Sequence, residues 1–262
     1  MAAKKPLSLL IAINMLFVLG ACGGGGGSSS SSSPVISSFA VKVFEDDAGV
    51  AIATVVSDNR KSLILSPVIV DVVSNLNSAD SFNNVDYSTL SLSGTTATSE
   101  IYTGAVTLDG IGANVTEYRD NSGDAKLMFL EVPSTLNLVQ TQGAALNGIP
   151  SGTYTYNGVH GFGRRVVGTT IETGNFSMSA NFTNKTFTYS GTTNSSTLSG
   201  SGSIDTSAGR FTSTGMTLNA PLGNYTATLN GLLHGTNASA VSGVYHTNDT
   251  YPDYAGAFVG AR

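Results

Sequence analysis

The sequence predicts an all-β fold. Apolar and polar residues alternate along several segments, and a period of two places one face of a strand against a core. Gly, Ser, Thr and Asn recur between these segments, whereas Lys and Glu are scarce, as is typical of a chain of many short strands joined by turns. Because 40% of the residues are hydrophobic and Phe and Tyr recur, the chain is able to bury a core.

The alternation is clearest in the C-terminal part of the chain. Residues 175–182 alternate strictly, a turn at residues 183–185 follows, and Phe187 and Tyr189 then resume the pattern. Residues 225–233 alternate as well, with one misfit. These segments are predicted to be strands with one buried face.

A bulge is predicted in the segment that contains Phe211, Met216 and Leu218. Phe211 is out of phase with Met216 and Leu218, so we expect a bulge or bend near Gly215. Further strands are predicted at residues 152–157, 166–170, 197–204, 238–246 and 254–261. Roughly eight or nine strands at regular spacing suggest a sandwich or a barrel. A barrel would pair the last strand with an early one and so remove an exposed edge.

The N-terminal part is less regular. Strands are predicted at residues 39–44, 50–56, 100–108, 113–119 and 126–132. For the segment from Asp120 to Asp124, a hairpin turn is favoured over a calcium loop. Ser66 and Pro67 have the types found at a helix start, but the β-branched residues after them favour a strand, and both interpretations remain open.

The first residues have the features of an export signal. Lys4 and Lys5 precede an apolar run at residues 7–20, which is shorter than the roughly 20 residues of a membrane-spanning helix. The run ends in Leu-Gly-Ala directly before Cys22, which is the lipobox pattern of bacterial lipoprotein precursors. We therefore expect removal of residues 1–21 and lipidation of Cys22, the single cysteine of the chain.

A flexible tether follows the predicted lipidation site. Residues 22–34 are rich in Gly and Ser and would separate the folded part from the membrane. Two or more acyl chains give stable membrane attachment. Gly23, rather than an aspartate, follows Cys22, which resembles an outer-membrane sorting signal. The predicted location is therefore the outer membrane, through a lipid anchor, at the cell surface.

The net charge of the chain limits the classes of partner that it can bind. The formal net charge is −5, and −7 once Lys4 and Lys5 are removed with the signal segment. This mildly acidic balance, with 11% charged residues, argues against nucleic acid as a partner. The sequence shows no second apolar run long enough for a membrane-spanning helix.

The sequence lacks the motifs of several enzyme classes. It has no Gly-x-Ser-x-Gly elbow, no phosphate-binding glycine loop and no His-Glu-x-x-His zinc pattern. We expect the three histidines, His160, His234 and His246, to be surface residues. The sequence therefore predicts a protein that is not an enzyme and has no metal site.

The C-terminal segment carries a family pattern. Residues 232–262 contain a His-Gly-x-Asn-Ala turn after a long strand, then Ser-Gly-Val-Tyr, then a closing Gly-Ala-Phe-x-Gly-x-Arg strand. This arrangement resembles the barrel domain of transferrin-binding protein B. Residues 152–158, 175–191 and 198–202 resemble the opening strand, the middle hairpin and the Gly-rich strand of that domain.

The resemblance implies a lobe built from an irregular β handle and an eight-stranded antiparallel barrel. We expect the handle-like region at residues 35–147 and the barrel at residues 148–262. The chain has one such lobe where transferrin-binding protein B has two, and it lacks the long insertions with which larger members bind host protein. Single-lobe relatives bind other partners, including complement regulators and haem.

For function, the resemblance implies non-catalytic binding at the cell surface, in iron or haem acquisition. The expected partners are a host or environmental iron-carrier protein or haem, together with an outer-membrane receptor. No cofactor is expected apart from haem. The alternative is a structural or adhesion-type envelope lipoprotein without a small-molecule ligand.

A candidate binding loop lies between the last two predicted strands. His246, Tyr251 and Tyr254 occur there with two aspartates and a proline, and aromatic residues on a loop are typical of recognition surfaces. His246 or Tyr251 could also supply an axial ligand to haem iron. The interpretation in which the tyrosines only cover the rim of the barrel is favoured over this binding role. If this loop is not the binding site, the next candidate site residues are His160, Arg164 and Arg165.

Overall fold

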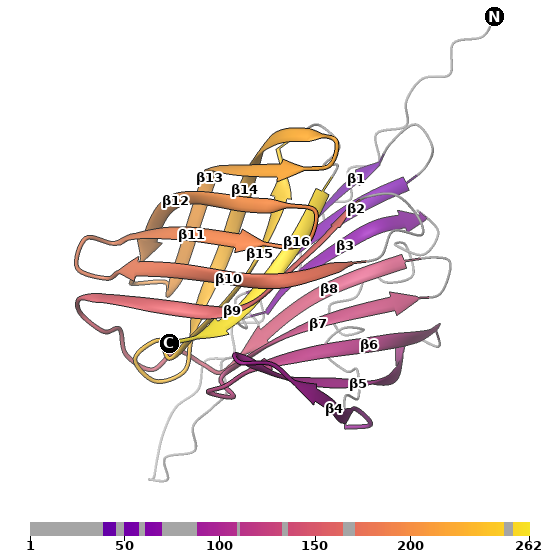
Figure 1. The fold of residues 1–262 in the computed structure, drawn as a ribbon, viewed down its shortest axis with the longest axis horizontal. Helices are drawn as coiled ribbons and strands as arrows, with labels where there is room; N and C mark the ends of the chain where they lie inside the picture. The colour runs from indigo at the N-terminus through magenta and orange to yellow at the C-terminus, as the bar shows by residue number, and fades with distance from the viewer. Residues whose placement is uncertain are drawn as a thin grey trace, which may run out of the picture. The chain divides into compact units, whose positions relative to one another are not determined.

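The computed structural model describes residues 39–45, 50–57, 61–69, 88–108, 111–132, 136–164, 171–248 and 254–262. Within these ranges the chain is all-β, with sixteen strands and no helix (Figure 1), so the predicted fold class is confirmed. The signal segment, Cys22 and the tether lie outside the described residues, as does the predicted strand at residues 166–170.

The first eight strands form one sheet. They are β1 (Phe39–Glu45), β2 (Val50–Ser57), β3 (Lys61–Ile69), β4 (Ser91–Thr95), β5 (Ser99–Leu108), β6 (Ile111–Asp120), β7 (Ala125–Val132) and β8 (Leu136–Gly143). Their order in the sheet is β1-β2-β3-β8-β7-β6-β5-β4, and every neighbouring pair is antiparallel.

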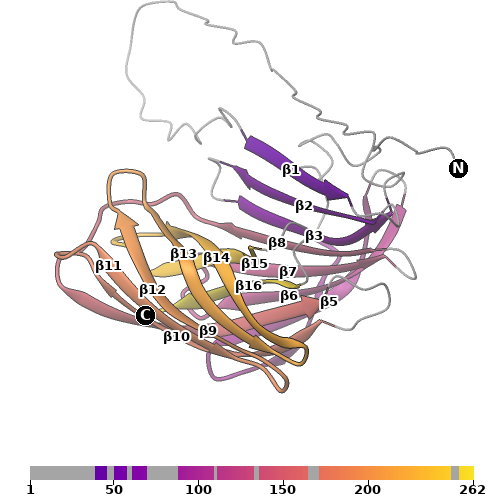
Figure 2. The ribbon, with the colours of Figure 1, turned by 90° about the horizontal axis from the view of Figure 1, so that it is seen from above.

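The last eight strands form a closed antiparallel barrel. They are β9 (Thr153–Arg164), β10 (Glu172–Asn181), β11 (Thr186–Thr192), β12 (Thr197–Asp205), β13 (Arg210–Ala220), β14 (Gly223–His234), β15 (Ala240–Thr247) and β16 (Tyr254–Ala261). Each strand pairs with the next along the chain, and β16 closes the ring by pairing with β9 (Figure 2). The predicted pairing of the last strand with an early one is confirmed.

Most predicted strands are present, and the differences have a physical cause. The five strands predicted in the N-terminal part correspond to β1, β2, β5, β6 and β7. The strands β4 and β8 were not predicted. The strand β4 carries no apolar alternation, because it is short and mostly exposed. Ser66 and Pro67 lie within the strand β3, which rules out a helix start at Ser66.

Two local predictions also agree with the structure. The register of β13 against β14 shifts between Ser213 and Met216, which is the irregularity predicted near Gly215. The segment after Asp120 is the turn of the β6–β7 hairpin, where the Asp120 carboxylate accepts hydrogen bonds from the backbone N–H groups of Ser122 (2.7 Å) and Ala125.

Aromatic rings fill the barrel interior, and five of them lie opposite a glycine of a neighbouring strand in the pairs named next. The directly paired residues are Phe176 with Gly158, Phe187 with Gly202, Phe211 with Gly231, Phe258 with Gly243 and Tyr245 with Gly256. A Cβ atom at Gly231 would lie 2.1 Å from the Phe211 ring. Glycine therefore provides the space into which the ring across the strand pair folds.

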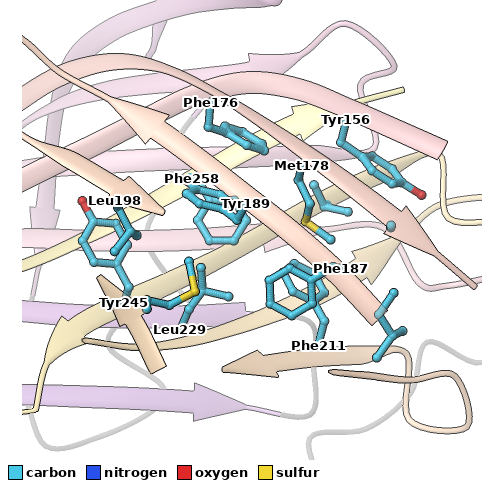
Figure 3. Close-up of a cluster of buried hydrophobic side chains, with 14 of the residues drawn as sticks. Tyr156, Phe176, Met178, Phe187, Tyr189, Leu198, Phe211, Leu229, Tyr245 and Phe258 are labelled. Atoms are coloured by element: carbon cyan, nitrogen blue, oxygen red, sulfur yellow. The ribbon is translucent and has the colours of Figure 1, made fainter. Parts of the chain in front are cut away.

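The rings also contact one another across the barrel. Phe258 lies 4.9 Å from Tyr189 and 5.1 Å from Phe176 between ring centroids, and all three side chains are at most 4% exposed (Figure 3). The interior is thus a packed aromatic core.

One wall of the barrel packs against the sheet. Phe129 and Leu127 of β7 form a buried cluster with Val244 of β15 and Ala257 of β16. The Phe129 ring occupies the space above Gly161, where a Cβ atom would lie 2.0 Å from it. Because their outward side is covered, β15 and β16 are buried on both faces and do not show the alternation of β11.

Polar contacts fix the segment that joins the sheet to the barrel. Asn147 forms a parallel bridge with Thr236 and accepts a hydrogen bond from the Asn237 N–H (2.7 Å) through its carbonyl oxygen. Ser239 Oγ donates to Asp124 Oδ2, which ties the β14–β15 turn to the β6–β7 turn.

Candidate functional site

Four connections leave the barrel at the same end, because consecutive strands are antiparallel. They join β9 to β10, β11 to β12, β13 to β14 and β15 to β16, and we call this the loop end. Residues 165–170 and 249–253 of these connections lie outside the described residues. The described part includes Leu222, which is 57% exposed in the β13–β14 turn.

The candidate residues of the β15–β16 connection occupy different environments. Tyr251 lies outside the described residues. His246 is half-buried on the outward side of β15, where it pairs with Thr228 of β14 and Ala255 of β16. Its Nδ1 lies 2.9 Å from the Thr247 carbonyl oxygen, and a carbonyl can only accept, so Nδ1 carries the proton and donates.

Tyr254 is a core residue at the loop end. Its side chain is 1% exposed, its ring stacks on Phe162 at 5.0 Å and it meets Tyr225 edge-on at 5.2 Å. The Tyr254 hydroxyl is buried and forms no hydrogen bond within the described part of the chain. Sequence reasoning therefore placed three residues in one loop, of which the structure puts Tyr254 inside the barrel and His246 on its outer wall.

Asn248 fixes the base of the loop. Its backbone N–H donates to the Thr226 carbonyl (2.9 Å), its Nδ2 donates to the Thr214 carbonyl (3.1 Å) and its Oδ1 accepts from Thr228 Oγ1 (2.6 Å). The loop thus leaves the barrel from a fixed point, which suits a recognition loop on a rigid scaffold.

Glu172 fixes the neighbouring turn between β11 and β12. Its carboxylate accepts hydrogen bonds from Ser195 Oγ (2.7 Å), Thr193 Oγ1 (2.9 Å) and the Ser195 N–H (3.1 Å). Burial acts to raise the pKa of Glu172, but these hydrogen bonds outweigh it, so that the pKa is lowered and the carboxylate is charged at neutral pH. Sequence reasoning missed both Glu172 and Asn248, because neither belongs to a motif.

A buried polar group lies deeper in the barrel. His160 Nδ1 is 2.7 Å from Tyr189 Oη, and His160 Nε2 is 3.1 Å from Tyr245 Oη. Tyr245 donates its hydroxyl proton to the Gly161 carbonyl (3.0 Å). His160 Nε2 therefore carries the ring proton, and Nδ1 accepts from Tyr189. Burial lowers the pKa of His160 to about 3, so the ring is neutral at physiological pH.

The expectation that the histidines are surface residues is wrong for two of the three. His160 and His234 are both 0% exposed. His234 Nε2 lies 2.8 Å from Ser242 Oγ and its Nδ1 lies 3.3 Å from the Ala144 carbonyl oxygen. Both rings have polar partners, which offset the energetic cost of burying their nitrogen atoms. Of the other reserve candidates, the side chain of Arg164 and all of Arg165 lie outside what the structure describes.

Two further features are absent from the described ranges. Those ranges contain no group of three or more His, Cys, Asp and Glu side chains that could hold a metal ion. They also contain no helix with the length and apolar character to cross a membrane.

Comparison with known proteins identifies the fold. No family model matches the chain, and no curated protein matches it. Among solved structures, intact Ap-TbpB with its N and C lobes matches with a TM-score of 0.52 and 12% identity, over 82% of this chain and 52% of that chain. Transferrin-binding protein B of Haemophilus parasuis Hp5 matches with a TM-score of 0.50 and 13% identity, over 86% and 53%.

A third solved structure matches along nearly its whole length. HpuA from Kingella denitrificans, in complex with human haemoglobin, has a TM-score of 0.50 and 11% identity over 89% of each chain. This chain spans about half the length of the transferrin-binding protein B structures that it matches. It has the fold of a single lobe of that kind, which confirms the resemblance predicted from the sequence.

Proposed function

We propose that this chain is a non-catalytic, lipid-anchored binding protein of the outer-membrane surface, which binds an iron-carrier protein during iron or haem acquisition. The observation that carries the proposal is the match over 89% of both chains to HpuA in complex with human haemoglobin. The match to transferrin-binding protein B supports the same class of partner. An outer-membrane receptor would receive the iron or haem.

Membrane attachment is assigned to Cys22. The lipobox and the Gly/Ser-rich tether support lipidation of Cys22. The tether would separate the lipid anchor from the folded lobe that follows it. Cys22→Ala is expected to leave an uncleaved precursor that incorporates no fatty-acid analogue in cells. Label on the Cys22→Ala variant would refute this assignment.

The loop end of the barrel is the proposed contact surface for the carrier protein. Asn248 and Glu172 hold two of its connections in place, and Leu222 offers exposed apolar area. Contacts presented by a fixed scaffold lose little conformational entropy on binding. His246 lies in β15 just before the connection that the sequence singled out, and Tyr251 belongs to that connection in the sequence.

Binding to immobilised human haemoglobin and human transferrin tests the proposal. The mature chain is expected to bind one of them, and replacement of residues 249–253 by Gly and Ser should weaken that binding at least tenfold, or about 1.4 kcal/mol. The matched control is Thr188→Ala with Ser190→Ala on the barrel wall, which should leave binding unchanged. Binding to neither protein would contradict the proposed class of partner.

Haem itself is the second candidate ligand, and the geometry of His246 favours it. With Nδ1–H donated to the Thr247 carbonyl, the lone pair of His246 lies on Nε2, which is the usual arrangement of a histidine that binds a metal. Titration with haemin should give a Soret shift that His246→Ala removes. A shift that persists in this variant would exclude His246 as the axial ligand.

The alternative function is a structural or adhesion-type envelope lipoprotein. It predicts that neither carrier protein nor haemin binds, and that deletion of the gene alters the cell envelope or attachment without affecting growth on haem or transferrin iron.

A further inference from the structure

The outer face of the sheet, opposite the barrel, carries a polar cluster. Leu92 of β4 pairs with Tyr102 of β5, and Tyr102 pairs with Glu117 of β6. Glu100 pairs with Arg119, which pairs with Lys126 of β7. Directly paired residues share one face, and Leu127, which packs toward the barrel, alternates with this set. We call these six residues the sheet patch.

Glu117 is the centre of the sheet patch. Its side chain is 0% exposed and lies between two cations: Arg119 Nε bonds its Oε1, and Lys126 Nζ lies 3.2 Å from its Oε2. A buried ion pair of this kind is seldom more stable than an apolar replacement of the same shape. The clearest structural effect of Glu117 is that it fixes the position of the Arg119 guanidinium.

Arg119 is held on a second side as well. Its Cζ lies 3.8 Å from the centroid of the Tyr102 ring, and the Tyr102 hydroxyl donates to Glu100 Oε2 (2.8 Å). The Arg119 side chain is still 37% exposed, and its two Nη groups form no hydrogen bond within the described part of the chain. A guanidinium fixed at Nε and stacked on a ring presents both Nη groups in the fork that matches a carboxylate.

Leu92 adds an apolar element beside this fork. It is 56% exposed, and among the described residues only one other large hydrophobic side chain, Leu222, is exposed. Tyrosine and arginine are enriched among the residues that dominate the energetics of protein interfaces, and Leu92 adds apolar contact area beside them.

We propose that the sheet patch is a second contact surface, which binds a protein segment that presents a carboxylate beside an apolar side chain. The carboxylate accepts two hydrogen bonds from the Nη groups of Arg119, and the apolar side chain packs on Leu92 and Tyr102. The charges of the patch balance, with Arg119 and Lys126 against Glu117 and Glu100, so the choice of a carboxylate rests on the two Nη groups of the partly exposed Arg119 side chain and not on net charge. Of the two carboxylates in the patch, Glu100 is the exposed one, and it weakens binding of an anion.

Peptide titration of the full mature chain tests the proposal. The probes are the acetylated, amidated pentapeptides Gly-Leu-Asp-Leu-Gly and Gly-Leu-Asn-Leu-Gly, and the readout is the NMR signal of Arg119 Nε–Hε. The Asp peptide is expected to shift this signal with a dissociation constant of about 1 mM, and the Asn peptide to bind at least about tenfold more weakly.

Four variants separate the parts of the patch, with the amide signal of Leu92 as the readout where Arg119 is replaced. Arg119→Gln should weaken binding of the Asp peptide at least about tenfold. Arg119→Lys should weaken it nearly as much, because an ammonium group cannot form the paired hydrogen bonds. Glu100→Gln should tighten binding about twofold, since it removes the opposing charge. The matched control is Arg262→Gln, because the Arg262 guanidinium also lies over a tyrosine ring, Tyr154 at 4.1 Å, without a buried carboxylate beside it.

Three outcomes would overturn the proposal. These are equal binding of the Asp and Asn peptides, unchanged binding in Arg119→Gln with the thermal midpoint preserved, or an equal loss in Arg262→Gln. Sedimentation velocity adds a further test: a dimer that dissociates in Arg119→Gln would assign the sheet patch to a second copy of the chain. The proposal is independent of the loop-end site, so failure of either leaves the other intact.

Discussion

The outward wall of the barrel and the outer face of the sheet are covered by different chemistry. On the barrel wall, rows of directly paired Ser, Thr and Asn residues cross the strands. One such row consists of Asn157, Ser177, Ser190, Ser199, Thr217 and Thr226. Over β10–β14, whose residues are all described, charged side chains occur on this wall only at Asp205 and Arg210. The outer face of the sheet instead has a buried carboxylate with two cations.

This difference shows where each part of the molecule obtains its stability. The barrel is stabilised from within by aromatic rings that fill the space over glycines, and its wall needs only groups that hydrogen-bond to water. The sheet also buries apolar side chains, among them Met128 and Leu130, but the same face holds a buried charge, Glu117, which contributes position more than stability. The barrel wall is therefore expected to tolerate substitution, whereas the barrel interior is not.

Deletion of residues 254–262 should have the largest effect. It removes β16 and leaves edges on β15 and β9, together with the space filled by Phe258, which is 0% exposed. We expect loss of cooperative unfolding in urea, followed by circular dichroism. Deletion of Arg262 alone is the control, and a truncated chain with an unchanged midpoint would contradict barrel closure by β16.

Acid should destabilise the barrel interior through His160. Burial lowers the pKa of His160 to about 3, whereas in the unfolded chain it is about 6.5, so between these values only the unfolded state binds the proton. Stability is therefore complete above about pH 6.5 and falls as the pH decreases toward 3, by up to about 1.4 kcal/mol per pH unit.

The variant His160→Gln isolates this contribution, because the carboxylates titrate in both proteins. The slope of unfolding free energy against pH, measured by urea denaturation between pH 4 and 6.5, should be smaller in His160→Gln. Equal slopes in the two proteins would show that His160 does not resist protonation in the folded state.

Gly231→Ala should destabilise the barrel by about 1–3 kcal/mol, because the new methyl group would overlap the buried Phe211 ring. The matched control is Gly112→Ala in the sheet, where a Cβ atom meets nothing within 4 Å, and it should change stability by no more than about 0.5 kcal/mol. Thermal unfolding measures both. Similar effects of the two substitutions would remove the distinction between barrel interior and sheet surface.

Thr188→Lys on the barrel wall should have the smallest effect, within about 0.5 kcal/mol, because Thr188 is exposed and pairs with Ser179 and Ser201 without a buried contact. Thermal unfolding at low and high salt measures it. A loss above about 1 kcal/mol would mean that the uncharged wall is itself needed for stability.

Several features of the fold were predictable because they depend on local pattern. The strict alternation before Phe182 fixed the buried face of β10, and the phase break after Phe211 identified the bulge in β13. The candidate binding loop was placed between the last two predicted strands, and β15 and β16 end within two residues of the predicted bounds. The burial of Tyr254 agrees with the interpretation in which the loop tyrosines cover the barrel rim, and the binding interpretation stood beside it because loop and core tyrosines look the same in sequence.

The sheet patch also escaped prediction, although the sequence contains a trace of it. Glu100 and Tyr102 lie two residues apart, as do Glu117 and Arg119, so each pair shares a face. Their meeting across β5 and β6 depends on the pairing register, and the exposure of Leu92 depends on its place in an edge strand. Neither property follows from spacing along the chain.

The sequence by itself determined the all-β class and the strand periodicity, since these follow from period-two alternation. Alternation left a sandwich and a barrel open, and the resemblance to transferrin-binding protein B implied the barrel that the last strand closes. The tertiary structure decided which aromatic ring faces which glycine, and that His160 and His234 are buried with polar partners. It also decided that β15 and β16 are covered on both sides. These outcomes depend on strand register and on contact between the sheet and the barrel, which join residues far apart in the chain.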